Sequence, residues 1–113
     1  MVFDNITRFI VRSNTPSSSL QLDVPTTVSL YITDLTGNAT ITSSMYKVTK
    51  QSGRDETLLI DYTSFTITDK IAIFDVLVTS PAIVGDNVSI LLKIITDSGL
   101  EVFLNVGNWK VIA

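Results

Sequence analysis

The amino-acid sequence predicts an all-β protein, an antiparallel β-sandwich of about seven or eight strands. Two β-rich runs, residues 87–96 and 100–106, flank the turn Asp97-Ser98-Gly99, which is the sequence form of a hairpin. Apolar residues occupy every second position of both runs: Val88, Ile90, Leu92 and Ile94, then Leu100, Val102, Leu104 and Val106. Only a packed sheet buries two such faces. At 113 residues, 45% of them hydrophobic, the chain has the size of one compact domain.

The N-terminal part predicts an edge strand. In Ile6–Ser13, Phe9 and Val11 share one face, while Arg8 and Arg12 lie on the other, where charges discourage edge-to-edge association. A polar stretch with one Pro and several Ser follows at 14–19 and breaks the pattern. We expect residues 1–19 to form this strand and a polar linker, and residues 20–113 to form the sandwich domain. Alternatively, residues 1–19 are an arm exchanged with a neighbouring molecule.

Three further segments carry β patterns in the first half of the domain. Residues 20–24 alternate briefly before Pro25. Residues 26–33 form the cleanest half-buried strand, with Val28, Leu30 and Ile32 pointing inward. Gly37 and Asn38 mark the turn at 34–38. Residues 39–50 are β-prone but weakly apolar, so we expect a strand with one wet face.

The middle of the chain predicts a polar hairpin loop at 51–56, a strand that begins at 57–62, and its continuation at 64–68. Residues 70–79 are apolar on both faces apart from Asp75. A continuous apolar run of this length is typical of a strand covered on both sides, or of a short buried helix. Its β-branched residues favour the strand. Pro81 allows one helical turn in the connection that follows.

The last strand predicts a β-bulge. Its inward residues are even-numbered up to Val106, whereas Trp109 and Val111 put the bulky side chains on odd numbers. A change of parity at Gly107-Asn108 is what one extra residue in a strand produces. Trp109 then points into the core, and an exposed binding Trp is the alternative. The succession of short strands and turns describes an immunoglobulin-like sandwich.

Composition excludes several kinds of chemistry. The chain has no Cys and no His, which excludes disulfides, Cys-based metal sites, Ser-His-Asp triads and His-bound zinc. The remaining carboxylates lie mostly in turns, and no spacing fixes two of them across a substrate. The sequence therefore predicts no enzyme activity and no cofactor. Asp34 with Asn38, and Asp86 with Asn87, are expected to be turn residues, because no D-x-D-x-D-G loop contains them, and calcium binding through their oxygens is the alternative.

Net charge and mean hydropathy limit the kinds of partner that the chain is expected to bind. A net charge of −3 with singly scattered Lys and Arg predicts no nucleic-acid surface. Neither a signal peptide nor a membrane-spanning run is evident, so we expect no membrane contact. A mean hydropathy of +0.39 is high for a small domain. It indicates either a generous apolar core or surface buried against another subunit, and composition does not separate the two.

Two aromatic residues are candidates for exposed contacts. Tyr31 and Phe103 each sit opposite the apolar face of their own strand. Together with Phe3, Phe9 and Ile10 of the N-terminal segment, they form the candidate interface. Assembly with copies of the chain or with a larger particle is one interpretation. An aromatic platform in a carbohydrate or cell-surface binding module is the alternative.

The order of features resembles the small immunoglobulin-like modules of tailed-phage virions. The resemblance covers roughly 26–112: a Val-Ser-Leu-Tyr-Ile-Thr-Asp strand, a Gly turn, a wet strand, an apolar strand, a Pro…Gly connection and a closing hairpin. It implies a non-enzymatic structural protein of a bacteriophage particle, made in the host cytoplasm and present in the virion. The chain ends at Ala113 without a following stalk, so a capsid decoration protein fits as well as a tail or baseplate component.

Overall fold

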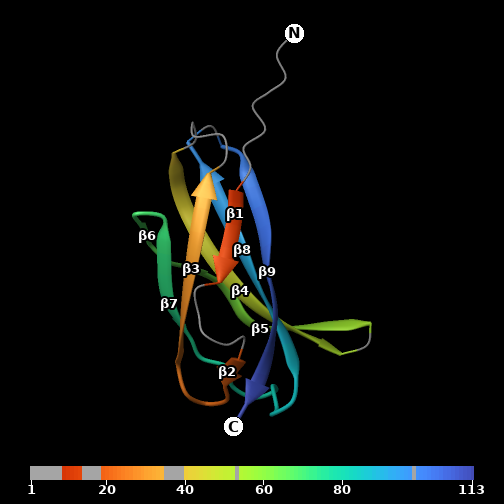
Figure 1. The fold of residues 1–113 in the computed structure, drawn as a ribbon. Helices are drawn as coiled ribbons and strands as arrows, with labels where there is room; N and C mark the ends of the chain where they lie inside the picture. Colours follow the sequence, from red (N-terminus) through yellow and green to blue (C-terminus); the bar gives the residue numbers. More distant parts are fainter. Residues whose placement is uncertain (1–8, 14–18, 35–39, 53, 98) are drawn as a thin grey trace.

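The computed structural model of the chain describes residues 9–13, 19–34, 40–52, 54–97 and 99–113. These ranges contain nine strands and no helix (Figure 1). The strands are β1 (Phe9–Ser13), β2 (Ser19–Gln21), β3 (Thr26–Asp34), β4 (Ile41–Ser52), β5 (Asp55–Ser64), β6 (Ile67–Thr68), β7 (Ile71–Val76), β8 (Asn87–Thr96) and β9 (Glu101–Ile112). The predicted all-β class is confirmed. The described strands exceed the expected number because β2 and β6 are fragments of three and two residues.

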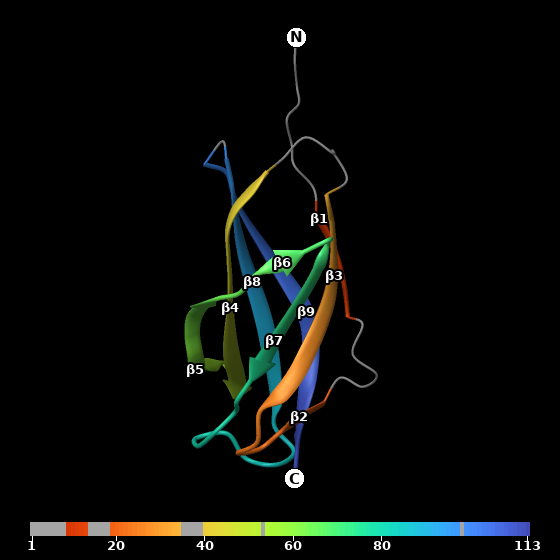
Figure 2. The same ribbon diagram turned by 90° about the vertical axis from the view of Figure 1, so that its left-hand side faces the viewer.

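The strands form two sheets packed against each other. One has the order β1-β3-β7-β6, and the other has the order β2-β9-β8-β4-β5. We call them the four-stranded and the five-stranded sheet. All pairings are antiparallel except that of β2 with β9. Figure 2 shows the layers edge-on, with the chain crossing from β5 in one sheet to β6 in the other.

The core lies between the sheets because one face of each main strand is apolar at every second position. β7 and β8 alternate strictly between buried and less buried residues. The buried apolar side chains are Leu20, Val28, Leu30, Ile32, Tyr46, Val48, Ala72, Phe74, Val76, Val78, Ala82, Val88, Ile90, Leu92, Ile94, Trp109 and Val111. The inward residues predicted for β3 and β8 are therefore confirmed.

Three aromatic rings join the sheets near the crossing from β5 to β6. Tyr46 stacks on Phe74 with 4.3 Å between ring centroids, and Phe65 lies 4.9 Å from Phe74. The Tyr46 hydroxyl donates a hydrogen bond to the backbone carbonyl of Asp75 across the sandwich at 3.1 Å. Burial, and secondarily the negative charge of Asp75, raises the pKa of Tyr46, so the hydroxyl keeps its proton and continues to donate.

The closing hairpin forms as predicted, with its bulge. Ser89 pairs with Asn108 and Leu91 with Asn105, so one residue of β8 faces two of β9. Gly107 sits in this bulge at φ 102°, where a residue without Cβ is favoured. The parity of β9 changes there, and Trp109 is buried at 1% exposure. The predicted inward Trp is confirmed.

The first half of β9 is less buried than its pattern predicts. Val102, Leu104 and Val106 are only partly buried, and Leu100 is exposed. The reason is the edge position of this segment. β2 pairs with β9 only at residues 110–112. Residues 101–108 of β9 therefore have a paired neighbour on one side only within the described sheet.

Four other expectations need correction. β7 is buried on one face, so the expectation that residues 70–79 are covered on both sides is wrong. The hairpin at 51–56 is tighter than the expected loop, since Ser52 already pairs with Asp55. Residues 57–68 do not form one continued strand, because β6 belongs to the other sheet. No helical turn follows Pro81 in residues 79–86.

The N-terminal strand has a place in its own sheet. β1 pairs antiparallel with β3 of the same chain from Phe9 opposite Asp34 to Ser13 opposite Leu30. Exchange of residues 1–19 between copies is therefore not needed to complete this sheet, and we do not propose it. Residues 1–8 and 14–18 of that segment lie outside the described residues.

Candidate functional site

The outer face of the four-stranded sheet carries a row of exposed apolar side chains. Tyr31 on β3 pairs directly with Ile71 on β7, and Ser29 pairs with Ile73. Directly opposite residues of an antiparallel pair point to the same face, so Tyr31, Ile71 and Ile73 adjoin one another. We call these three residues the apolar outer face. Their side chains are 43%, 38% and 60% exposed, respectively.

This exposure follows from the sequence of β7, Ile-Ala-Ile-Phe-Asp-Val. Ala72, Phe74 and Val76 point into the core, so Ile71 and Ile73 must point outward. Isolated surface apolar residues need no explanation, but adjoining ones on one face of a sheet are typical of a protein contact. The signal was present in the sequence as the two-sided apolar run at 70–79.

A hollow of about 380 Å³ lies beside the apolar outer face. It is lined by Ile71 and Ile73 from β7 and by Thr66, Thr68 and Asp69 from the segment around β6. Its walls combine apolar side chains with hydroxyl and carboxylate oxygens. A bulky side chain of a partner that binds the apolar outer face can fit into this hollow.

The outer face of the five-stranded sheet has a different character. Phe103 on β9 is 61% exposed. The Lys93 ammonium lies 6.0 Å from the Phe103 ring centroid and 5.4 Å from that of Tyr62, and Lys47 lies 5.2 Å from Tyr62. Lys93 also pairs with Glu101 at 3.6 Å. The lysines thus flank the rings of this face with polar groups.

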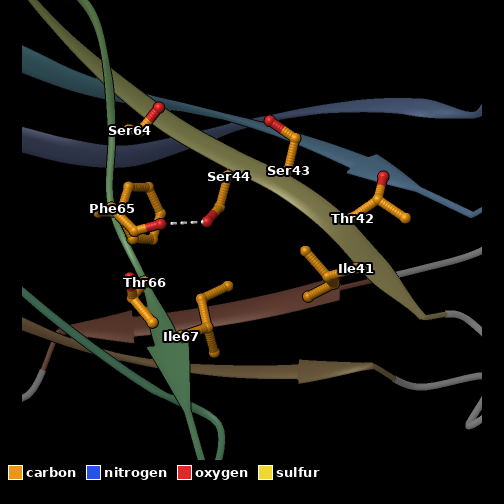
Figure 3. Close-up of a pocket in the computed structure, with 8 residues that line it drawn as sticks. All are labelled: Ile41, Thr42, Ser43, Ser44, Ser64, Phe65, Thr66 and Ile67. Carbon is orange, nitrogen blue, oxygen red and sulfur yellow. Dashed lines mark hydrogen bonds between the residues drawn. The ribbon is translucent and has the colours of Figure 1, made fainter.

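A groove of about 340 Å³ opens where the chain leaves the five-stranded sheet (Figure 3). Its lining comes from β4 and from the crossing segment: Ile41, Thr42, Ser43, Ser44, Ser64, Phe65, Thr66 and Ile67. The Ser44 hydroxyl donates to the carbonyl of Phe65 at 2.6 Å, and Thr42 donates to the carbonyl of Ile95 at 3.1 Å. These side chains can form hydrogen bonds, but none of the lining residues is an acid or a base.

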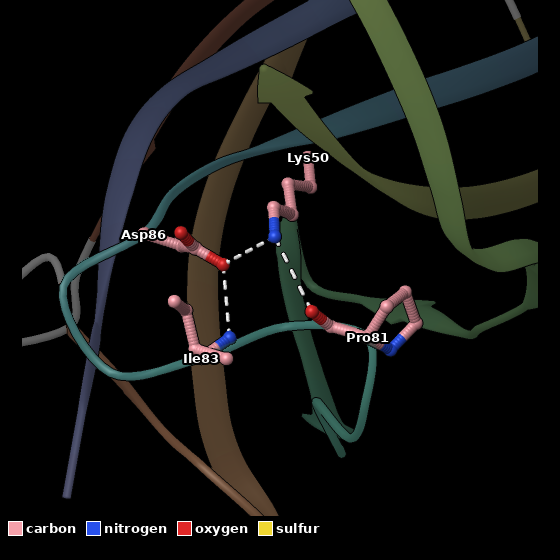
Figure 4. A network of polar contacts seen from close by, with 4 residues as sticks. All are labelled: Lys50, Pro81, Ile83 and Asp86. Atoms are coloured by element: carbon pink, nitrogen blue, oxygen red, sulfur yellow. Dashed lines mark hydrogen bonds and ion pairs between the residues drawn. The ribbon is translucent and has the colours of Figure 1, made fainter.

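One ion pair fixes the connection between β7 and β8 (Figure 4). Lys50 Nζ lies 2.8 Å from Asp86 Oδ2 and also donates to the carbonyl of Pro81 at 3.2 Å. The amide of Ile83 donates to the same Asp86 oxygen at 2.9 Å. These contacts tie the loop to β4, and the side chains of Ile83 and Val84 in the loop are exposed.

The Asp86 contacts make stability depend on pH. The hydrogen bond from Lys50, and secondarily that from the Ile83 amide, lowers the pKa of Asp86 below its usual 3.8. Because the folded-state pKa is depressed, this stabilisation is present above the unfolded-state pKa and is lost as pH falls through the folded value. We expect Asp86→Asn to lower stability near neutral pH and to flatten its decline in acid. Urea unfolding at several pH values measures this.

Glu56→Gln is the matched control, since Glu56 is an exposed carboxylate at the end of the β4–β5 hairpin. This variant should keep the acid dependence of the unchanged chain. Identical pH profiles for Asp86→Asn and Glu56→Gln would contradict the role given to Asp86.

The structure separates the predicted interface residues. Tyr31 and Phe103 are both exposed, but they lie on the outer faces of different sheets, so one flat contact does not include both. Phe9 and Ile10 are described only by their backbone pairing with Asp34 and Thr33. Phe3 lies outside the described residues. The residues missed from the sequence are Ile71 and Ile73.

Metal-ligating groups do not gather in the described ranges. No set of three or more acidic side chains there could hold a metal ion. Of the turn residues considered for calcium, Asp86 is bound to Lys50, and the segment 35–39 with Asn38 lies outside the described residues. Among the same residues, no helix is long and apolar enough to cross a membrane.

The apolar outer face is therefore the strongest candidate for a functional surface. It combines adjoining exposed apolar side chains with a hollow at its side. Comparison of the sequence with protein-family models and with curated proteins finds no match.

Proposed function

We propose that this chain is a non-enzymatic structural protein that acts by assembling with protein partners through the apolar outer face. The carrying observation is the exposure of Ile73 at 60%, in register beside Ser29 and next to Tyr31 and Ile71. Burying such side chains contributes about 25 cal/mol per Å². The apolar outer face offers this gain only to a partner whose surface matches its shape.

We propose a virus particle as the assembly, with the chain as a capsid decoration or tail or baseplate component of a bacteriophage. Its resemblance to phage virion modules over residues 26–112 supports this location. The proposed partners are copies of the chain, a larger capsid or tail, or both. In this proposal the chain needs no enzyme activity, cofactor, nucleic acid or membrane.

The finer fold proposal is an immunoglobulin-like sandwich. The order β1-β3-β7-β6 corresponds to the A-B-E-D sheet of that fold, and β9-β8-β4-β5 corresponds to G-F-C-C′. The division of the N-terminal strands between the two sheets adds support. The large buried Trp differs in position, since Trp109 lies on β9 rather than on strand C, which corresponds to β4.

The second candidate is a carbohydrate or cell-surface binding module. The observation that favours it is Phe103, exposed beside Lys93 on the opposite face. A ring flanked by hydrogen-bond donors can stack on a sugar. In that case a glycan array would show binding that Phe103→Ala removes and Ile73→Lys retains.

Density-gradient fractionation of virus particles from the culture that naturally produces the chain tests the proposed function. We expect the chain to migrate with the particles in a fixed ratio to their major protein. Ile73→Lys places a charge in the contact and should lower the particle-bound share about tenfold or more. Leu58→Lys is the matched control, because Leu58 is 50% exposed on β5 of the other sheet. Recovery of the unchanged chain only as free protein would contradict the proposal.

A further inference from the structure

We infer that the apolar outer face binds a second copy of this chain, through a two-fold axis lying in the plane between the two faces. This inference rests on the proposed function and names the partner for that surface. Arg12 and Asp75 lie at opposite corners of the described outer face of the four-stranded sheet, with the apolar outer face between them, and Asp69 lies at the hollow beside it. That arrangement is self-complementary, as a two-fold interface requires.

The positions of the two charges follow from the pairing register. Arg12 on β1 is opposite Tyr31, at one end of the described face. Asp75 on β7 is opposite Thr27, at the other end, and accepts a hydrogen bond from the Thr27 hydroxyl at 2.8 Å. Both charged side chains are exposed. The two corners are four residues apart along β3, which is about 13 Å, and two strand spacings apart across the sheet, which is about 10 Å.

A two-fold axis that lies in the plane between the two faces and bisects the line between these corners at a right angle exchanges them. Arg12 of each copy then faces Asp75 of the other, so the interface contains the ion pair twice. The same operation places Ile73 of one copy against Tyr31 and Ile71 of the other. The two sheets cross steeply in this arrangement, closer to orthogonal than to aligned sheet packing.

The hollow beside Ile73 fits this arrangement. It opens on the β6 side of Ile73, between that residue and Thr66 and Thr68. The two-fold operation brings Tyr31 of the second copy next to Ile73 on that side. Tyr31 is the largest uncharged side chain of the face, and each copy offers it a recess of about 380 Å³.

Within the described residues, neither Arg12 nor Asp75 has an ion-pair partner, whereas Lys50 and Lys93 do. A partner of unrelated sequence would not need the opposite corners to carry opposite charges. A second copy does, because the symmetry makes each corner meet its diagonal counterpart.

Sedimentation velocity over about a hundredfold range of concentration tests the inference with the full chain. We expect a reversible dimer. Arg12→Asp and Asp75→Arg each turn two attractive pairs into repulsive ones and should weaken the dimer about tenfold or more at low salt. Mixing the two single variants restores both pairs in a heterodimer, and the double variant restores them in a homodimer. Recovered association in both cases would also show that the variants fold.

A monomer at every concentration would overturn the second copy as partner. Co-migration with particles, lost only in Ile73→Lys, would then still support the proposed assembly with another protein. A wild-type dimer unaffected by either single charge reversal would overturn the two-fold arrangement. Two single variants that stay monomeric when mixed would do the same.

Discussion

Trp109→Ala should lower the free energy of unfolding by about 3–5 kcal/mol, the usual cost of removing a large aromatic side chain from a core. Trp109 is the largest fully buried side chain, at 1% exposure. It reaches the core because the bulge at Gly107 changes the parity of β9. Its loss leaves a cavity that the surrounding β strands, held by backbone hydrogen bonds, close only in part. Urea unfolding followed by far-ultraviolet circular dichroism measures the change.

Phe103→Ala is the control for this prediction. Phe103 lies on the same strand, but its side chain is 61% exposed, so its removal should change stability by no more than about 0.5 kcal/mol. Equal losses of unfolding free energy in the two variants would contradict the conclusion that the bulge turns Trp109 into the core.

Phe74→Ala should have an effect of similar size, about 3–5 kcal/mol. Phe74 stacks on Tyr46 and lies against Phe65, so the substitution removes the ring that packs closely against both of the others. The hydrogen bond from Tyr46 to the Asp75 carbonyl would lose its packing support. Urea unfolding midpoints measure the loss.

The matched control is Ile73→Ala, one residue away on β7. Ile73 points outward and is 60% exposed, so the isolated chain should lose no more than about 0.5 kcal/mol. A large loss in Ile73→Ala at concentrations where the chain is monomeric would show that Ile73 supports the fold. The apolar outer face would then no longer be a surface free for a partner.

The sequence predicts the strands of this fold where apolar alternation is strict. β3 and β8 have it, and the inward Val28, Leu30, Ile90 and Leu92 are buried as expected. The bulge was predictable as well, because a change of parity around Gly107 leaves few other ways to bury Trp109. The alternation of apolar residues within each strand is sufficient to predict these strands and the bulge, and the structure agrees with it.

Apolar alternation does not predict burial or sheet membership where these depend on how the two sheets pack. β7 is apolar on both sides, but a sequence does not show how many layers cover a strand. The crossing from β5 to β6 was missed for a related reason, since residues 57–68 stay β-prone while the chain changes sheets. The candidate site combines both cases. Tyr31 was predictable from its own strand, whereas Ile71 and Ile73 became surface residues only once the layers were placed.

Hydroxyl-radical footprinting of the free and the assembled chain tests the central claim most directly, because Tyr31 and Phe103 are exposed aromatic probes on opposite outer faces. We predict that assembly protects Tyr31, together with the peptide that contains Ile71 and Ile73, and that Phe103 stays as reactive as in the free chain. Protection of Phe103 with unchanged oxidation of Tyr31 would contradict the assignment of the apolar outer face as the assembly surface.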